Sequence, residues 1–286
     1  MKLISFQVSG NAHYGLVEGD KVIDLTKRLG PKYAGIIDFI RDVPTAEVSK
    51  LKGESDYALA DVKLLPVVPN PGKIICIGLN YEEHKKEGAG IRPADDKPML
   101  FARWPETLTA HGDPLIIPKV STKLDFEAEL LVVIGKPTGR YLPAAKALDT
   151  VFGYSCMNEG SVRDWQRHSS QVTAGKNFVG TGPCGPWIVT ADEVGDVTKL
   201  DIELRLNGEV MQKASTGEMI WSIAETIEYI TNWIPLNPGD LIATGTPAGV
   251  GSRRTPPVFM KPGDVAEVTI SKIGTLKNVV ALETGV

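Results

Sequence analysis

Three carboxylates occupy alternate positions in the segment KLDFEAELLVVIG, which begins at residue 123. In a β-strand Asp125, Glu127 and Glu129 would share one face, because successive side chains point to opposite faces. The segment runs on into the apolar residues 130–134, so we expect the strand to enter a buried core. Like charges at this spacing repel each other, and a buried carboxylate is costly unless it is paired or binds a metal. The pattern therefore favours a hard cation such as Mg²⁺, Mn²⁺ or Ca²⁺ over a solvated strand face, whereas zinc usually recruits His or Cys.

A candidate general base lies in the segment GLNYEEHKKEGAG. Asn80 and Glu83 have the spacing of a helix N-cap, and Gly88 is a suitable stop, so one or two helical turns are predicted between them. On such a turn His84 and Glu87 are three residues apart and lie on the same side. A histidine held by a carboxylate is the usual arrangement of a general base. The alternative is an exposed, highly charged helix without a catalytic role.

Further polar candidates lie downstream, in the segments NEGSVRDWQRHSSQVTAGKNF and ATGTPAGVG. The first contains another acid, Glu159, followed by Arg163, Gln166 and, in a loop of small residues, Lys176. A surface ion pair between Arg163 and Asp164 would contribute little stability and is the simpler interpretation of those two charges. The second segment is rich in glycine and hydroxyl groups but lacks the Gly-Lys-Ser/Thr ending of a phosphate-binding loop. A tight turn between strands explains it equally well.

The overall composition excludes several classes of protein. The 286 residues carry 31 basic and 35 acidic side chains, a formal net charge of −4, without a basic stripe, so a nucleic-acid partner is not expected. The first fifteen residues lack the apolar stretch of a signal peptide, and the apolar run at 130–134 is too short to span a bilayer. The three cysteines are scattered along the chain, which argues against a disulfide framework. We expect a soluble, cytoplasmic protein without a membrane partner.

The elements that must position these candidates are mostly strands. Residues 1–65 alternate like short strands around a helix-like segment, and three prolines between positions 66 and 71 indicate a linker. We therefore expect a small N-terminal α/β module, residues 1–70, followed by a β-rich catalytic domain, residues 71–286. In that domain the dipeptide Asn207-Gly208 predicts a hairpin with a type I′ turn.

One long helix is predicted in the second domain, over residues 215–235. Ser215 and Glu218 have the spacing of a capping box, and Pro235 ends the segment. Isoleucines and a methionine recur between them at three- and four-residue steps, as the buried face of a helix requires. No βαβ alternation is visible, so the expected fold class is β-rich α+β.

Taken in order, several segments resemble the fumarylacetoacetate hydrolase (FAH) superfamily from about residue 72 to the C-terminus. The segments that carry the resemblance are GLNYEEHKKE, PMLFARWPETL, DFEAELLVVIG, GYSCMNEGSVRDWQ, GKNFVGTGPCGPWIV, RLNGEVMQ and NPGDLIATGTPAGVG. Each segment is weak alone, whereas seven in the right order are specific. The resemblance implies a mixed β-sandwich roll in a homodimer, with the active site at one end of the roll.

The resemblance also implies a set of site residues. Members bind one Mg²⁺ or Mn²⁺, with Ca²⁺ as a substitute in crystals, through three carboxylates that correspond here to Glu127, Glu129 and Glu159. The third ligand is usually an Asp, and the extra methylene of Glu159 lengthens the arm by roughly 1.5 Å. Asp125 is interpreted as a supporting acid that does not bind the ion. The remaining family positions correspond to His84 and Glu87 as the dyad that forms the general base, and to Lys176 as a further catalytic residue. Arg163, Gln166 and Thr246 correspond to substrate-binding positions.

The reaction that the resemblance implies is the processing of a small keto acid. We expect first a hydrolase that cleaves a carbon–carbon bond of a β-diketo or acylpyruvate-type acid through a metal-bound enolate, because the His84–Glu87 pair suits hydrolysis. Decarboxylation of oxaloacetate-like acids and isomerisation of hydroxymuconate-type acids use the same intermediate and are the alternatives. A non-catalytic β-domain that binds a cation is the alternative from another class. A Ser-His-Asp hydrolase is disfavoured because no Gly-x-Ser-x-Gly segment is present.

The sequence leaves the recognition of the far end of the substrate open. The segment GAGIRPADDKP is rich in glycine and charge, and is interpreted as a lid that orders when substrate binds. Either Arg92 and Lys97 in this segment, or Arg253 and Arg254 after the glycine-rich loop, would then meet a distal carboxylate. A solvated surface is the alternative for all four.

Overall fold

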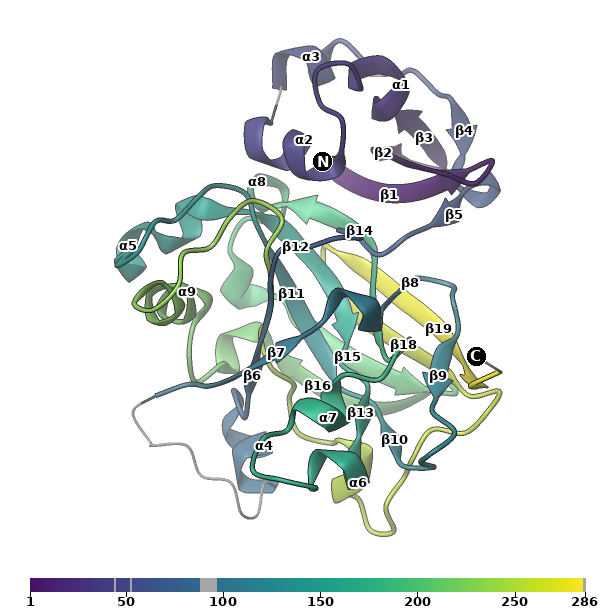
Figure 1. Cartoon of the computed structure of the whole chain (residues 1–286), viewed down its shortest axis with the longest axis vertical. Helices are drawn as coiled ribbons and strands as arrows, with labels where there is room; N and C mark the ends of the chain where they lie inside the picture. The colour runs from purple at the N-terminus through teal and green to yellow at the C-terminus, as the bar shows by residue number, and fades with distance from the viewer. Residues whose placement is uncertain (44, 52, 88–96, 285–286) are drawn as a thin grey trace.

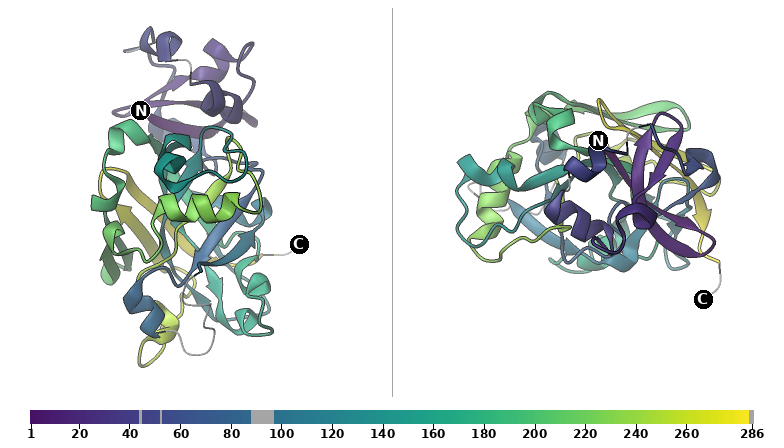
Figure 2. Two further views of the ribbon diagram at one scale, coloured as in Figure 1. Left: turned by 90° about the vertical axis from the view of Figure 1, so that its left-hand side faces the viewer. Right: turned by 90° about the horizontal axis from the view of Figure 1, so that it is seen from above.

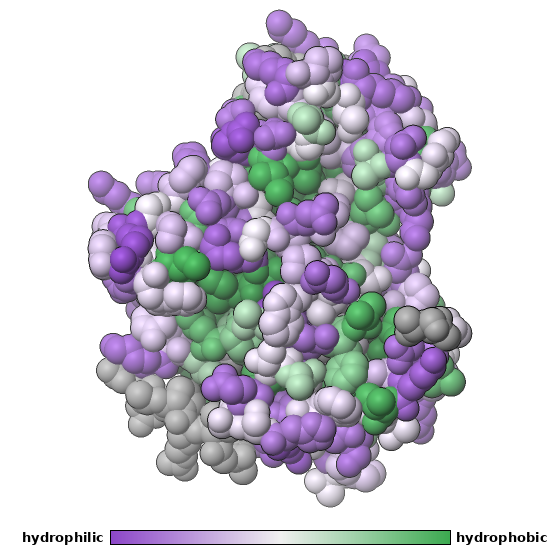
Figure 3. Space-filling model, viewed as in Figure 1, coloured by the Kyte–Doolittle hydropathy of each residue, from purple (hydrophilic) through white to green (hydrophobic). Residues whose placement is uncertain are grey.

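The structure, a computed structural model of the chain, describes residues 1–43, 45–51, 53–87 and 97–284. Figure 1 shows a small N-terminal module above a larger body that is built mainly from strands. The views in Figure 2 show the same arrangement from the side and from above, with the module on one end of an elongated body. On the face shown in Figure 3, apolar residues gather where the module meets the body.

The N-terminal module is an antiparallel sheet covered by short helices. Alternating apolar residues form its first three strands, as expected, and the predicted helix in this region is confirmed as a shorter element. Its elements are β1 (Lys2–Val8), β2 (Asn11–Glu18), β3 (Lys21–Asp24), α1 (Leu25–Leu29), α2 (Ile36–Asp42), α3 (Thr45–Ser49), β4 (Tyr57–Ala58), the 3₁₀ turn η1 (Leu59–Asp61) and β5 (Lys63–Leu64). Phe39 and Ile40 of α2 are fully buried and anchor the helix on the sheet.

The sheet of the module continues into the body. Strand β1 pairs with β14 (Gly182–Thr190) in antiparallel register, with Leu3 opposite Ile188. The predicted linker is itself packed, because Val67 and Val68 are fully buried and the Ser5 hydroxyl donates to the Val67 carbonyl at 3.0 Å. The division at residue 70 stays a prediction, and within the described ranges one large sheet runs across it.

Two packed sheets form the body. The large sheet adds β6 (Ile74–Gly78), β7 (Met99–Arg103), β8 (Leu108–Ala110), β11 (Ala128–Ile134), β12 (Val151–Asn158) and β17 (Leu241–Ala243) to β14 and the module. The second sheet contains β9 (Leu115–Ile117), β15 (Asp201–Leu206), β16 (Glu209–Ser215), β18 (Val265–Ile270) and β19 (Gly274–Leu282). Leu130 and Val132 of β11 share one apolar cluster with Leu204 of β15 and Val268 of β18, so the core lies between the sheets. This strand-rich, mixed α+β architecture is the expected fold class.

Short elements close the ends of the body. They are a two-stranded pair, β10 (Leu124–Asp125) with β13 (Ser161–Val162), the helices α4 (Glu82–Glu87), α5 (Ala144–Ala147), α6 (Arg163–Gln166), α7 (Thr173–Lys176), α8 (Ala191–Val194) and α9 (Ile223–Thr231), and the 3₁₀ turns η2 (Pro105–Thr107), η3 (Leu148–Thr150), η4 (Val197–Lys199), η5 (Thr216–Glu218) and η6 (Gly251–Arg253). The predicted hairpin is confirmed, since Asn207 and Gly208 both have positive φ, 54° and 83°, between β15 and β16. Among the described residues, no helix combines the length and the apolar composition needed to cross a membrane.

The predicted helix over residues 215–235 is wrong in its first part. The capping box of Ser215 and Glu218 does form, but it caps the 3₁₀ turn η5, and α9 begins later with its own capping box at Ser222. The reason is that a side chain from a distant part of the sequence binds the backbone of this segment. The Asn80 side chain accepts from the Trp221 amide at 2.7 Å and donates to the Trp221 carbonyl at 3.1 Å, which holds this segment out of the helix.

The predicted N-cap of α4 is wrong for the same reason. Asn80 also donates to the Thr244 carbonyl at 2.8 Å, so its carboxamide serves residues distant in the sequence instead of the first turn of the helix. The helix itself spans Glu82–Glu87. The predicted stop at Gly88 lies outside the described residues, as does Arg92 in the segment interpreted as a lid.

Candidate active site

One cavity of about 350 Å³ collects most of the residues that the sequence singled out. Its wall contains the following predicted residues: His84, Glu127, Glu129, Glu159, Arg163, Gln166, Lys176, Thr246 and Arg253. They come from α4, the acidic segment, the end of β12, the helices α6 and α7, and the loop after β17. Apolar residues of β6 and β7 complete the wall, and this mixture of apolar surface and convergent polar groups is typical of a small-molecule site.

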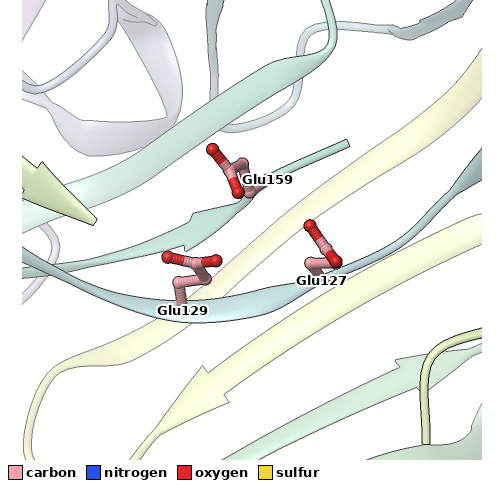
Figure 4. Close-up of side chains that lie close together, drawn as sticks. All are labelled: Glu127, Glu129 and Glu159. Carbon is pink, nitrogen blue, oxygen red and sulfur yellow. The ribbon is translucent and has the colours of Figure 1, made fainter. Parts of the chain in front are cut away.

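The acidic segment is not one continuous strand. Its first part, β10, pairs with β13, whereas its second part, β11, pairs with β12, and Glu127 lies in the break between them. The Glu159 amide donates to the Glu127 carbonyl at 2.8 Å, which holds the end of β12 against this break. As a result Glu127, Glu129 and Glu159 converge, with one carboxylate oxygen of each within 4.8 Å of the others (Figure 4).

The three carboxylates suit a divalent cation. All three side chains are buried, and Glu159 Oε1 has no hydrogen-bond partner among the described residues. Burial and the neighbouring charges of Glu159 and Glu127 raise the pKa of Glu129 well above its usual range. A donor set made only of carboxylate oxygens is the kind that Mg²⁺, Mn²⁺ and Ca²⁺ prefer. The residues therefore fit such an ion on charge and on donor chemistry.

Two buried cations balance part of this negative charge. Arg163 donates from Nη2 to Glu127 Oε1 at 2.8 Å, and Lys176 contacts Glu127 and donates to Glu159 Oε2 at 2.7 Å. Burial opposes ionisation of Glu127, but the charges of Arg163 and Lys176 outweigh it and hold the pKa of Glu127 well below its usual range. Glu127 is therefore ionised at neutral pH. The interpretation of Arg163 as half of a surface ion pair with Asp164 is wrong, because its guanidinium is buried in this network.

Asp125 does not line the cavity, but its carboxylate links two segments that do. It accepts from Arg163 Nε at 2.7 Å and from the backbone amides of Gly251 and Ser252 at 2.8 and 2.9 Å. It is not part of the carboxylate cluster, and it joins α6 to η6 through one buried charge. This geometry agrees with its interpretation as a supporting acid.

Asp125→Asn is expected to weaken the site without removing a ligand. The amide loses the charge that holds Arg163, so we expect the free energy of unfolding to fall by about 3 kcal/mol, as for other broken buried ion pairs. The affinity for Mn²⁺ should fall about 10- to 100-fold because Arg163 no longer orients Glu127. Chemical unfolding and Mn²⁺ titration measure the two effects, with the exposed Asp201→Asn as the control. An unchanged Mn²⁺ affinity in Asp125→Asn would contradict this role.

The predicted contact between His84 and Glu87 is present in the structure. His84 Nδ1 lies 3.0 Å from Glu87 Oε2, and Glu87 Oε1 accepts from the Gly249 amide at 2.9 Å. Burial works against ionisation of Glu87, but hydrogen bonds from His84 and Gly249 outweigh it and lower the pKa of Glu87. Only 8% of His84 is exposed, so the alternative of an exposed helix is wrong for this residue, and its catalytic role stays a prediction. With Nδ1 held by Glu87, Nε2 is the ring atom that can exchange a proton.

The remaining predicted residues fall into two groups. Gln166 accepts from Arg163 Nη1 at 3.0 Å through Oε1, which leaves its amide hydrogens as donors, and Thr246 accepts from Gln212 at 2.8 Å. Both line the cavity. In contrast, Arg254 donates to the carbonyls of Gly249 and Met211 at 3.2 and 2.6 Å, and neither Arg254 nor Lys97 lines the cavity.

Two supporting residues were missed from the sequence. Arg103 of β7 is buried, donates to the Thr181 hydroxyl at 2.6 Å, and places Nη1 3.6 Å from Glu159 Oε1. Gln212 of β16 accepts from the Ala128 amide at 2.9 Å and so ties the acidic segment to the loop that contains Thr246. The hydrogen-bond partners named here lie between 34 and 84 residues away, so no local pattern points to these contacts.

The chain is similar to several known proteins over most of its length. Residues 73–281 match the family model described as fumarylacetoacetate (FAA) hydrolase C-terminal. The oxaloacetate tautomerase YisK of Bacillus subtilis (strain 168) is 42% identical over 228 residues, which cover 79% of this chain and 75% of that protein. The crystal structure of maleylpyruvate hydrolase from Sphingobium sp. SYK-6 with manganese(II) and pyruvate is 31% identical, with a TM-score of 0.83 and coverage of 99% and 100%. That of a fumarylacetoacetate hydrolase from Exiguobacterium antarcticum is 36% identical, with a TM-score of 0.79 and the same coverage.

Proposed function

Because the chain belongs to the fumarylacetoacetate hydrolase family, we propose that it is a divalent-metal-dependent hydrolase that cleaves a carbon–carbon bond of an acylpyruvate-type keto acid. The observation that carries the proposal is that His84, which is paired with Glu87, lines the same cavity as the three carboxylates. An ion held by Glu127, Glu129 and Glu159 would supply Lewis-acid activation of the keto acid's oxygens. The manganese(II) and pyruvate in the related maleylpyruvate hydrolase support this choice of ion and ligand.

The residues of the chain divide the chemistry between them. His84, oriented by Glu87, takes a proton from water through Nε2, and the water oxygen forms a bond to the distal carbonyl carbon. The carbonyl oxygen becomes an oxyanion, which the Gln166 amide and the Lys176 ammonium of the cavity wall would stabilise. When the oxyanion collapses, the carbon–carbon bond breaks and its electron pair goes to the departing enolate. The proton on His84 then returns to that carbon, so the products are a carboxylic acid and a 2-keto acid.

Oxaloacetate keto–enol tautomerisation is a second candidate, and the 42% identity to YisK favours it. This reaction needs only the removal of a proton beside the ketone and its return to the oxygen, which His84 can perform. It needs no donor for a second oxyanion. The donors of Gln166 and Lys176 support hydrolysis as the first choice.

The purified protein is expected to hydrolyse an acylpyruvate in the presence of Mg²⁺ or Mn²⁺ and to lose that activity with EDTA. Hydrolysis of acetylpyruvate is measured by the loss of its enol absorbance. The enol–keto exchange of oxaloacetate is measured in parallel. Restored turnover after Mn²⁺ is added back distinguishes metal removal from denaturation. Hydrolysis that persists in EDTA contradicts the metal assignment, and exchange of oxaloacetate without any hydrolysis favours the second candidate.

A further inference from the structure

The Glu159 carboxylate lies between two buried cations. Its Oε2 atom accepts from Lys176 Nζ at 2.7 Å, and its Oε1 atom lies 3.6 Å from Arg103 Nη1. Oε1 has no hydrogen-bond partner among the described residues, so Arg103 acts on it through charge alone. Each oxygen of this carboxylate therefore has a cation beside it, and of these two cations Lys176 lines the cavity whereas Arg103 does not.

Arg103 is among the largest side chains that are fully buried, and its hydrogen bonds within the described ranges go to uncharged groups. Nε donates to the Thr107 hydroxyl at 3.0 Å, Nη2 to the Thr181 hydroxyl at 2.6 Å and Nη1 to the Gly160 carbonyl at 3.4 Å. In the same part of the chain, Glu159 is the carboxylate that forms an ion pair with Arg103. Because a buried charge is costly unless it is paired, the position of Arg103 depends on Glu159.

The backbone around Arg103 leaves its guanidinium little room to move. A Cβ at Gly182 would lie 2.7 Å from Arg103 Nε, and a Cβ at Gly160 would lie 2.4 Å from the Thr181 carbonyl oxygen. Glycine at these two positions allows the segment that follows Glu159 to pack closely against the start of β14. The guanidinium is therefore held between these two segments.

Strand β7 orients both cations that lie beside Glu159. Met99, Phe101 and Arg103 occupy alternate positions of β7 and so share one face of the strand. Met99 and Phe101 line the cavity, and the centre of the Phe101 ring lies 5.1 Å from Lys176 Nζ, close enough for a cation–π contact. The face of β7 that contacts Lys176 thus also carries Arg103.

Charge attraction does not explain an arginine beside a candidate cation site. The positive charge of Arg103 repels a divalent ion, so by its charge alone it weakens ion binding. The benefit that Arg103 can bring is geometric. A glutamate side chain has several rotatable bonds, and each one that is free before binding must be fixed when the ion binds. A carboxylate that is already held by cations on both sides avoids most of this entropy cost.

We propose that Arg103 is a positioning residue, which holds the Glu159 carboxylate in the orientation that binds the divalent ion. This inference rests on the proposed function for the ion site at Glu127, Glu129 and Glu159. In the proposed reaction Lys176 also serves the oxyanion, so it cannot be devoted to Glu159. Arg103 lies outside the cavity and keeps its contacts with Glu159 and its neutral neighbours throughout the reaction.

Mn²⁺ titration of the metal-free protein, followed by the electron paramagnetic resonance signal of the free ion, tests this role apart from turnover. Arg103→Met is expected to weaken Mn²⁺ binding about 10- to 100-fold, the range for removal of a group that orients a metal ligand. Loss of the positive charge alone would strengthen Mn²⁺ binding, so the sign of the change separates positioning from electrostatics. Arg103→Lys keeps the attraction to Glu159 without the planar fork, and should recover part of the affinity.

Two further variants separate this role from a loss of stability. Ile40→Ala, in the N-terminal module, removes a fully buried side chain and should lower the free energy of unfolding without changing the Mn²⁺ affinity. Thr181→Val removes the acceptor of Arg103 Nη2 but keeps the charge of Arg103 and a side chain of similar size. It should weaken Mn²⁺ binding by a smaller factor, about 3- to 10-fold, and it carries the test if Arg103→Met does not fold.

Unchanged or tighter Mn²⁺ binding in Arg103→Met, or in Thr181→Val if the arginine variant does not fold, would overturn the positioning role. An equal loss of affinity in Ile40→Ala would overturn it as well, and so would a wild-type protein that binds no Mn²⁺. Failure of the proposed reaction has a different outcome. If the wild type hydrolyses no acylpyruvate while Arg103→Met weakens Mn²⁺ binding as expected, the reaction is wrong and the role of Arg103 is supported.

Discussion

Glu127→Gln is expected to lower kcat/KM for the keto acid by roughly 10³-fold or more, the equivalent of about 4 kcal/mol of lost transition-state stabilisation. Glu127 is the carboxylate on which the cluster is built, since it lies next to Glu129 and Glu159 and is paired with both Arg163 and Lys176. The variant keeps the shape of the side chain but removes one negative charge. The positive charges of Arg163 and Lys176 would then face only the two remaining carboxylates of the cluster. This balance disfavours binding of a divalent cation.

The effect on folding must be separated from the effect on the site. Removing one partner of a buried ion pair is destabilising, so Glu127→Gln should also unfold at lower denaturant concentration. Glu129→Gln is the companion variant, because the raised pKa of Glu129 shows that its charge is costly in the absence of a cation. It should lose turnover with little loss of stability. Glu209→Gln, exposed on β16, is the control, and variants of Glu127 and Glu129 that keep more than a tenth of wild-type turnover would contradict the assignment.

His84→Ala is expected to lower kcat by about 10²- to 10⁴-fold, the range for loss of a general base, and to leave the Mn²⁺ affinity unchanged. His84 lies on the cavity wall and is held by Glu87, but it is not a member of the carboxylate cluster. Steady-state turnover at saturating substrate measures the first quantity and Mn²⁺ titration the second. Loss of both together would place His84 among the ligands instead.

Glu87→Gln provides a graded test of the same pair. The side-chain oxygen of the introduced glutamine can still accept from the Gly249 backbone amide, but it no longer stabilises a protonated His84. Because His84 itself is retained, the loss in kcat should be smaller than in His84→Ala. Glu83→Gln on the same helix is the matched control, since Glu83 is exposed and forms an ion pair with Lys86. Full turnover in His84→Ala would exclude this histidine as the base.

The cluster of carboxylates could be predicted in part because its signal is local. Two-residue spacing before an apolar run singled out Asp125, Glu127 and Glu129 from the sequence alone. The family resemblance then selected Glu127 and Glu129 as expected ligands and added Glu159. The break in the strand at Glu127 could not be predicted, because it depends on pairing of β10 and β11 with two different partners. That break is what separates Asp125 from the cluster of carboxylates. The interpretation of Asp125 as a supporting acid stays a prediction, and its contacts with α6 and η6 came only from the structure.

The errors arise from contacts between residues that are distant in the sequence. Ser215 and Glu218 form the capping box that their spacing predicts, yet Asn80 binds the backbone of Trp221 and delays the helix to residue 223. Arg103 and Gln212 were missed because an arginine or a glutamine in a strand is usually exposed. Only tertiary contacts bring Arg103 beside Glu159 and place Gln212 between two elements of the site.

The central claim is that Glu127, Glu129 and Glu159 hold one divalent ion. Titration of the metal-free protein with Mn²⁺, followed by the electron paramagnetic resonance signal of the free ion, tests it most directly. We predict saturation at one ion per chain in the wild type and loss of that binding in Glu127→Gln. Saturable binding of equal strength in the wild type and in Glu127→Gln, or no saturable binding in the wild type, would contradict the claim.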